Sequence, residues 1–116
     1  MILKAGVDAR GIQPELALGL MIANSVYLGA GYELVVTALV DGSHMQTSLH
    51  YNGLAADLRL PAIGTAAVQD LVKKLKNALG AQWDVVLEGA DTPGSTGAHI
   101  HMEFDPKTPA RPAIKT

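Results

Sequence analysis

The sequence predicts a single α+β domain with a mostly antiparallel sheet and helices on one face of that sheet. The chain has 116 residues, of which 48% are hydrophobic and 17% charged, which suffices for one hydrophobic core but not for two. Its apolar patterns predict the order strand, helix, strand, strand, helix, strand, strand. We expect residues 1–105 to form the domain and residues 106–116, with three of the six prolines, to form an extended or mobile tail.

The first helix is predicted over residues 13–29. Pro14 lies where the first turn of a helix tolerates proline, and Gly29 and Gly31 are expected to end the helix. Apolar side chains crowd one side of this helix, which we expect to face the core: Leu16, Leu18, Leu20, Met21, Ile22 and Val26. Residues 32–40 (YELVVTALV) are mostly β-branched or apolar, which is typical of a strand covered on both faces.

The rest of the domain is predicted to contain three strands and a second helix. Residues 54–60 (LAADLRL) predict one strand. Residues 82–88 (QWDVVLE) and 98–104 (AHIHMEF) predict two more, separated by a loop rich in Gly, Ser, Thr and Pro. Between residues 61 and 80, apolar residues recur at helical spacing and Gly80 follows them: Val68, Leu71, Val72, Leu75 and Leu79. Lysines 73, 74 and 76 are expected to point outward.

Composition excludes several classes of function. A formal net charge of −2 gives no field that would collect nucleic acid or an anionic membrane. The absence of cysteine excludes disulfides and thiolate metal sites, so a metal would have to bind to histidines and carboxylates. No apolar run approaches the ~20 residues of a membrane span, and no signal peptide is evident. We therefore expect a chain made in the cytoplasm, without membrane insertion; its oligomeric state is left open.

Polar residues alternate with apolar ones in two of the predicted strands. Because alternate side chains of a strand share a face, His99, His101 and Glu103 are expected to lie together. The same rule places Asp57 beside Arg59 on one face of an otherwise apolar strand. A carboxylate in such a strand requires a partner or a cation that offsets its desolvation.

These residues have the composition of a catalytic metal site. His50 precedes Asp57 by seven residues, across a turn that Asn52 and Gly53 can form, so the two side chains can converge. A histidine from residues 98–104 would complete a set of two imidazoles and one carboxylate. Such a set leaves one coordination position open, as in catalytic zinc sites, and also binds other first-row metals. For His44, a surface or core position is the more common interpretation.

The same residues resemble a known superfamily. Residues 48–57 (SLHYNGLAAD) resemble the SxHxxGxAxD motif of the LAS metallopeptidases, and residues 98–101 (AHIH) resemble their terminal HxH strand. This superfamily comprises lysostaphin-type enzymes, D-alanyl-D-alanine carboxypeptidases and the hedgehog signalling domain. The resemblance extends from about residue 32 to residue 105 and is greatest to small phage or prophage peptidases of the D-Ala-D-Ala carboxypeptidase branch. It implies a LAS/hedgehog-like fold.

The resemblance also implies roles for individual residues. It implies that zinc is bound by His50, Asp57 and His101, and that zinc activates water for amide hydrolysis. His99 would stand beside the metal and donate a hydrogen bond to the oxyanion of the scissile carbonyl.

The general base departs from the pattern of the superfamily, which places an acidic residue a few positions before the last histidines. Here Glu88 precedes His99 by eleven residues. If residues 82–88 and 98–104 pair as a hairpin, the loop between them can be long without moving Glu88 away from the histidines. We therefore favour Glu88 as the base and keep Asp91, which lies within the loop, as the competitor.

Substrate binding departs from the pattern as well. Carboxypeptidase members supply an arginine upstream of the SxH motif for the terminal carboxylate of the substrate, whereas residues 30–47 contain neither arginine nor lysine. His44, Gln46 and Arg59 are the remaining candidates for binding a carboxylate or an amide. This departure favours an endopeptidase that cuts within the stem or cross-link peptides of peptidoglycan.

The function expected from the sequence is that of a zinc metallopeptidase acting on bacterial cell walls, in the manner of a bacteriophage endolysin or a wall-penetrating protein. Such an enzyme would wait in the cytoplasm until phage-mediated release. The alternative is a catalytically inactive zinc-binding interaction module, as in the hedgehog branch. A metal-free domain with incidental histidines would leave Asp57 without a partner.

Overall fold

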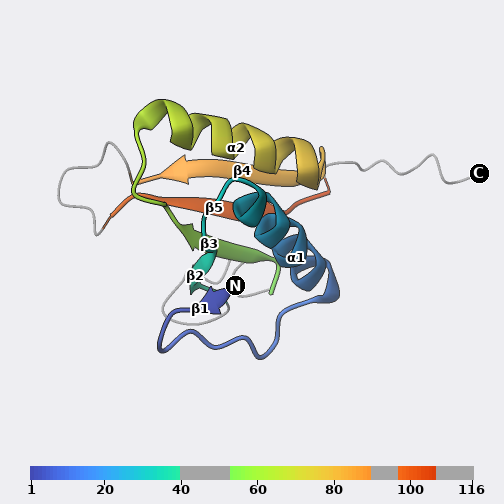
Figure 1. Ribbon diagram of the computed structural model, residues 1–116. Coiled ribbons are helices and arrows are strands. Elements are labelled where there is room, and N and C mark those ends of the chain that lie inside the picture. The colour runs from blue at the N-terminus through green and yellow to red at the C-terminus, as the bar shows by residue number, and fades with distance from the viewer. Residues whose placement is uncertain (40–52, 90–96, 107–116) are drawn as a thin grey trace, which may run out of the picture.

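The computed structural model describes residues 1–39, 53–89 and 97–106, which form the elements labelled in Figure 1. Their order is strand, helix, strand, strand, helix, strand, strand, as the sequence predicts. The strands are β1 (Ile2–Leu3), β2 (Val35–Ala38), β3 (Ala55–Arg59), β4 (Trp83–Glu88) and β5 (His99–Phe104). The helices are α1 (Pro14–Gly29) and α2 (Thr65–Leu79).

The five strands form one mostly antiparallel sheet, in the order β1-β2-β3-β5-β4. Only β1 and β2 run parallel; the other three neighbouring pairs are antiparallel. The predicted hairpin exists, because β4 pairs with β5 along its whole length, from Trp83 opposite Phe104 to Glu88 opposite His99. β5 lies between β3 and β4, so its side chains have a strand neighbour on either side.

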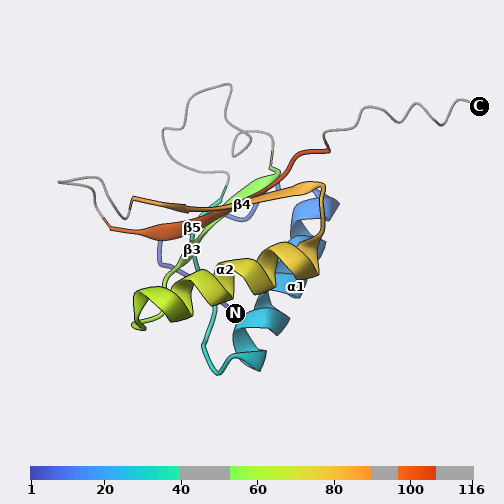
Figure 2. The same cartoon turned by 90° about the horizontal axis from the view of Figure 1, so that it is seen from above.

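Both helices cover the same face of the sheet, as Figure 2 shows from above. α1 packs against α2 and β5, and α2 packs against β4. Ala56 and Leu58 of β3 and Ile100 and Met102 of β5 point into the core between the layers and are fully buried. Their neighbours along the strands therefore point to the opposite face, which the helices do not cover.

α1 differs from the expectation that its apolar residues crowd one side. Leu18 and Met21 are 58% and 63% exposed, whereas the core side of the helix is formed by residues spaced three or four apart: Leu16, Leu20, Ala23 and Tyr27. The helix has a single charged residue, Glu15, and is apolar almost all round, so hydrophobicity alone does not identify its buried side.

β2 is shorter than the predicted strand over residues 32–40 and is not fully buried on both faces. Val36 points into the core, whereas Val35 and Thr37 on the other side of the strand are half-buried. The register shifts between Val36 and Ala38 where β2 pairs with β3, which interrupts the regular alternation. The predicted tail falls on residues 106–116, of which all but Pro106 lie outside the described residues. Neither helix in the described part of the chain is long and apolar enough to cross a membrane.

Candidate functional site

The sheet face that the helices leave uncovered carries the polar residues of the predicted site. Antiparallel pairing places Asp57 of β3 directly opposite His101 of β5, and Glu88 of β4 directly opposite His99. Residues opposite one another in antiparallel strands point to the same face, and so do alternate residues of one strand. Three strands therefore bring two imidazoles and two carboxylates together.

His101 lies between two carboxylates. Its Nδ1 is 2.9 Å from Oδ1 of Asp57, and its Nε2 is 2.6 Å from Oε1 of Glu103. The side chains of Asp57 and His101 are only 16% and 14% exposed, so this contact is largely shielded from water. Asp57 thus has the partner that a carboxylate in an apolar strand requires.

The surroundings of His101 favour its protonated form. Burial alone would lower its pKa, but the hydrogen bonds with Asp57 and Glu103, together with the charges of Asp57 and Glu88, outweigh burial and raise the pKa to about 9. The two carboxylates therefore favour a cation at this position, and protonation of His101 can supply it. A metal ion would compete with that proton for the same donors.

His99 lies two residues before His101 on β5 and approaches the carboxylate of Asp57 as well. Its Nε2 is 3.7 Å from Oδ1 of Asp57 and 3.2 Å from Oε1 of Glu88, and its Nδ1 is 3.4 Å from the carbonyl oxygen of Gly97. Asp57 Oδ1 therefore faces one ring nitrogen from each histidine. His99 is more exposed than His101, with 29% of its side chain accessible.

The β4–β5 hairpin brings Glu88 to the histidines despite the eleven residues between Glu88 and His99. Gly89 follows Glu88 with a φ of +80°, and a Cβ there would lie 2.8 Å from the carbonyl oxygen of Gly97. The two glycines therefore bring the strand ends close together. The pairing of β4 with β5 fixes the position of Glu88 opposite His99, as the hairpin interpretation expects.

Gly53, the fixed glycine of the SxHxxGxAxD pattern, holds the chain at the start of β3. Its φ is +73°, and a Cβ would collide with the carbonyl oxygen of Gly11. The carbonyl oxygen of Gly53 accepts a hydrogen bond from the backbone N–H of Gln13, at 2.9 Å. A small residue is thus required here because the segment before α1 crosses Gly53 closely.

The donor atoms of this face could in principle hold a metal ion. One ligand atom from each of Asp57, Glu88 and His99 lies within 4.8 Å of the others. On each histidine, the ring nitrogen turned away from Asp57 faces an acceptor, which is Gly97 O for His99 and Glu103 for His101. Metal-ligating histidines are usually oriented by such an acceptor, so the donor chemistry fits zinc or a similar first-row metal.

Four of the predicted site residues lie outside the described residues: His44, Gln46, His50 and Asp91. The structure therefore brings together Asp57, His101, His99 and Glu88 of the predicted site, places Arg59 opposite His99, and does not bear on those four. Asp57 can belong to the ligand set with His50 and His101 that the resemblance implies. It can equally belong to the set with Glu88 and His99 that the described atoms form.

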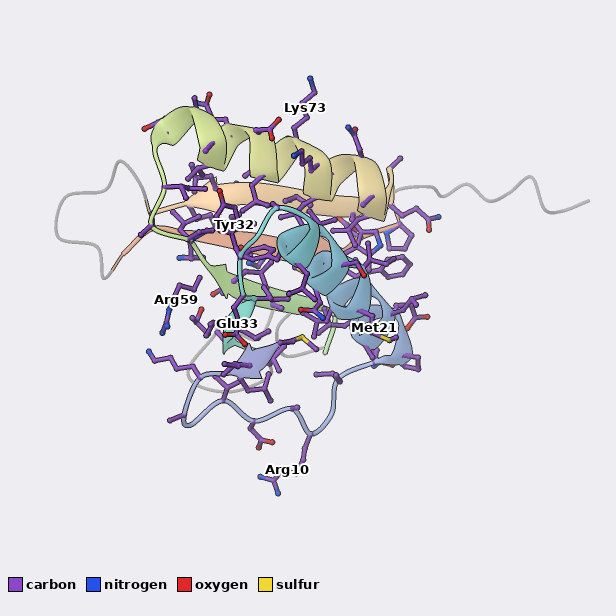
Figure 3. All side chains as sticks on the ribbon, in the orientation of Figure 1. Arg10, Met21, Tyr32, Glu33, Arg59 and Lys73 are labelled. Carbon is purple, nitrogen blue, oxygen red and sulfur yellow. The ribbon has the colours of Figure 1, made fainter. Side chains whose placement is uncertain are left out.

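Arg59 and Glu103 do not pair with one another, although the sequence predicts both on the polar faces of neighbouring strands. Arg59 lies opposite His99 and Glu103 lies opposite Ala55, at the two ends of the β3–β5 ladder, and Glu103 instead binds His101. Figure 3 shows Arg59 projecting on the side of the molecule away from α1. The register of β3 against β5 keeps Arg59 and Glu103 apart, because Glu103 lies opposite Ala55, four residues of extended strand away from Arg59.

Sequence reasoning missed two residues near the site. Glu103 was expected on the histidine face, but not as the hydrogen-bond partner of His101. Lys4 lies far from the motifs in the sequence, yet it lines a cleft of about 380 Å³ together with Asp57, Arg59 and His99. The exposed run before it gives no local signal, because its position depends on the pairing of β1 with β2.

Comparison of the chain with protein-family models, with curated proteins and with solved structures gives no match.

Proposed function

We propose that this protein is a zinc-dependent peptidase of LAS/hedgehog-like fold that hydrolyses an amide bond in the stem or cross-link peptides of peptidoglycan. The observation that carries the proposal is the position of Asp57 Oδ1, which faces ring nitrogens of both His99 and His101, with Glu88 at hydrogen-bond distance from His99. A metal-binding carboxylate, imidazoles and a nearby carboxylate base are the groups that metal-assisted amide hydrolysis requires.

The described residues divide the chemistry between them. Asp57 and His101 would hold zinc together with His50, as the resemblance implies, and the bound metal would supply Lewis acidity toward the scissile carbonyl and the attacking water. Glu88, which is 47% exposed, takes the proton of the attacking water and returns it to the leaving amine. His99 donates to the developing oxyanion, and its Nδ1 faces the Gly97 carbonyl oxygen, which fixes the ring.

The biological setting that we propose is digestion of the bacterial cell wall during phage lysis or wall penetration. The proposed substrate is a peptide. We propose no binding of nucleic acid and no insertion into a membrane. The motifs of residues 48–57 and 98–101 support this setting through their resemblance to phage and prophage peptidases. An endopeptidase is favoured over a carboxypeptidase because the upstream arginine of carboxypeptidases has no counterpart in residues 30–47.

The second candidate is a catalytically inactive zinc-binding interaction module. That interpretation depends on the loss of the general base, since the acidic residue is displaced in the sequence. The position of Glu88 opposite His99, 3.2 Å from its Nε2, supplies an acidic group where a base is needed. We therefore place the peptidase first.

The experiment that tests the proposal is digestion of purified peptidoglycan by the full chain, with zinc and after chelation. Mass spectrometry of the released fragments identifies the cleaved bond. We expect zinc-dependent release that is lost in Glu88→Gln and retained in Glu15→Gln, which removes an exposed carboxylate at the start of α1. Zinc binding without release from any wall type would contradict the peptidase and favour the interaction module.

A further inference from the structure

A cleft of about 380 Å³ adjoins the candidate site on the uncovered face of the sheet. Asp57 and His99 of the candidate site line it, together with Lys4, Arg59 and Thr37. A volume near the lower end of the ~300–1,000 Å³ range of small-molecule clefts suits one or two amino-acid residues of a peptide. The cleft is thus a candidate subsite for the part of the substrate that flanks the scissile bond.

The cleft has charges of opposite sign. Asp57 supplies negative charge beside the histidines, whereas Lys4 and Arg59 are exposed cations. Within residues 1–39, 53–89 and 97–106, neither cation has an ion pair or a side-chain hydrogen bond, whereas Arg10 pairs with Asp8 and Lys74 with Asp70. Two cations with no anionic partner in this part of the chain, facing one cleft, are suited to an anionic group.

The backbones that carry these two cations are held in place. The backbone N–H of Lys4 donates to the carbonyl oxygen of Val36 at 2.9 Å, which attaches it to β2. The carbonyl oxygen of Arg59 accepts a hydrogen bond from the hydroxyl of the fully buried Tyr27 at 3.0 Å. Arg59 is also the cross-strand partner of His99. The base of the Arg59 side chain is therefore fixed relative to the candidate catalytic site.

We propose that Lys4 and Arg59 bind a carboxylate that the substrate carries next to the scissile amide. This inference rests on the proposed function and specifies its substrate class. Arginine can bind both oxygens of a carboxylate and lysine adds a point charge, so the pair recognises an anion and orients it. A peptide bound in this way has its carboxylate at the cations and its neighbouring amide toward His99 and Asp57.

Two kinds of peptide carry such a carboxylate. One has a C-terminal carboxylate, and its cleavage makes the enzyme a carboxypeptidase. The other has an internal free carboxylate, such as that of a γ-linked glutamyl residue, and its cleavage is endopeptidic. Lys4 and Arg59 would in either case replace the upstream arginine whose absence from residues 30–47 favoured an endopeptidase.

The test is a binding experiment on the full-length, zinc-loaded protein, with two matched pairs of probes. The first pair is N-acetyl-D-alanine and its amide. The second is a γ-glutamyl dipeptide, blocked at its C-terminus, with its α-carboxyl free or amidated. Dissociation constants come from NMR titration. We expect at least one acid to bind about tenfold more tightly than its own amide, and the pair that shows this preference identifies the source of the carboxylate.

Variants locate that preference. Lys4→Gln and Arg59→Gln should each weaken binding of the preferred acid threefold to tenfold, leave the amide unchanged, and together abolish the preference. Lys73→Gln removes an exposed lysine from α2, which lies on the helix-covered side of the sheet (Figure 2), and should change neither constant. Circular dichroism verifies that each variant is folded.

The proposal is overturned if neither acid is preferred over its amide, or if the preference survives in the Lys4→Gln, Arg59→Gln double variant. The second result would show that the acid binds the metal instead. Binding needs no turnover, so a preference that depends on both cations supports the subsite even if no peptide is hydrolysed. Hydrolysis without the preference would instead support the peptidase and overturn the subsite.

Discussion

Oδ1 of Asp57 lies 2.9 Å from Nδ1 of His101, its direct cross-strand partner, and 3.7 Å from Nε2 of His99. These residues are 44 and 42 positions apart in the sequence, and only the β3–β5 pairing brings them together. One carboxylate oxygen thus faces two imidazoles on a half-buried surface, which is where a metal ion would have to bind.

Replacing Asp57 should weaken zinc binding more than any other single change among the described residues. Asp57→Asn removes the charge that both candidate ligand sets share, and we expect the dissociation constant for zinc to rise at least about 100-fold. Competition with a fluorescent zinc chelator measures it. Asp70→Asn, an exposed change on α2, is the control. An unchanged constant in Asp57→Asn would exclude this face as the metal site.

The effect of Glu88→Gln distinguishes the two possible sets of zinc ligands, Asp57 with His50 and His101 or Asp57 with Glu88 and His99. If Glu88 is the base, peptide release should fall by about 10²–10⁴-fold while zinc affinity stays within a few-fold of wild type. If Glu88 is a ligand with Asp57 and His99, zinc affinity should fall with activity. Zinc competition and peptide release, measured on the same preparation, separate these outcomes. We expect the first, and a loss of zinc by the variant would assign Glu88 to the metal.

Glu103 should act on the site through His101. Its carboxylate fixes the ring with Nδ1 toward Asp57, so Glu103→Gln should weaken zinc binding about 10- to 100-fold without unfolding the protein. The matched control is Glu15→Gln, the same chemical change at an exposed residue at the start of α1. Equal zinc affinities for Glu103→Gln and wild type would show that Glu103 does not position the ring.

The raised pKa of His101 predicts a pH dependence for the metal-free protein. The folded-state pKa of about 9 exceeds the ordinary value of 6.5, so the protonated ring stabilises the fold fully below about pH 6.5. This contribution is lost as the pH rises through 9 and is on the order of 1 kcal/mol or more. Urea unfolding in the presence of chelator measures it. The stability difference between wild type and His101→Gln should shrink from pH 6 to pH 9.5, and a constant difference would contradict the assignment.

Gly53→Ala should destabilise the fold. The positive φ of Gly53 and the collision of a new Cβ with the Gly11 carbonyl oxygen together predict a loss of at least about 2 kcal/mol in the free energy of unfolding. Thermal unfolding measures the loss. Gly29→Ala, at the end of α1 with no atom within 4 Å of the new Cβ, should be neutral or slightly stabilising. Equal effects of the two changes would show that Gly53 is not required for close packing.

The sequence predicted most of the fold and the face of the site, because alternation of polar and apolar residues fixes which side chains of a strand point together. Asp57, His99 and His101 were placed correctly on that basis. The pairing of β4 with β5, on which the placement of Glu88 was made conditional, exists in the structure. Its register keeps Val85 and Met102 turned into the core.

The remaining features depend on contacts that no local pattern encodes. Lys4 reaches the cleft only because β1 pairs with β2, and the His101–Glu103 contact depends on side-chain rotamers within one strand. α1 is apolar on nearly every side, so its sequence does not indicate that Leu18 and Met21 are exposed. Tertiary packing decides such cases, and it cannot be obtained from the spacing of residues in one element.

Zinc-dependent peptidase activity is tested most directly by titrating the chelated, full-length protein with zinc while peptide release from purified peptidoglycan is followed. We expect no release without metal and a rise that saturates at one zinc ion per chain, with no such rise in Asp57→Asn. Release that is unaffected by chelation would show that the protein is not a zinc peptidase, and so would the absence of release at every zinc concentration although one ion binds at Asp57.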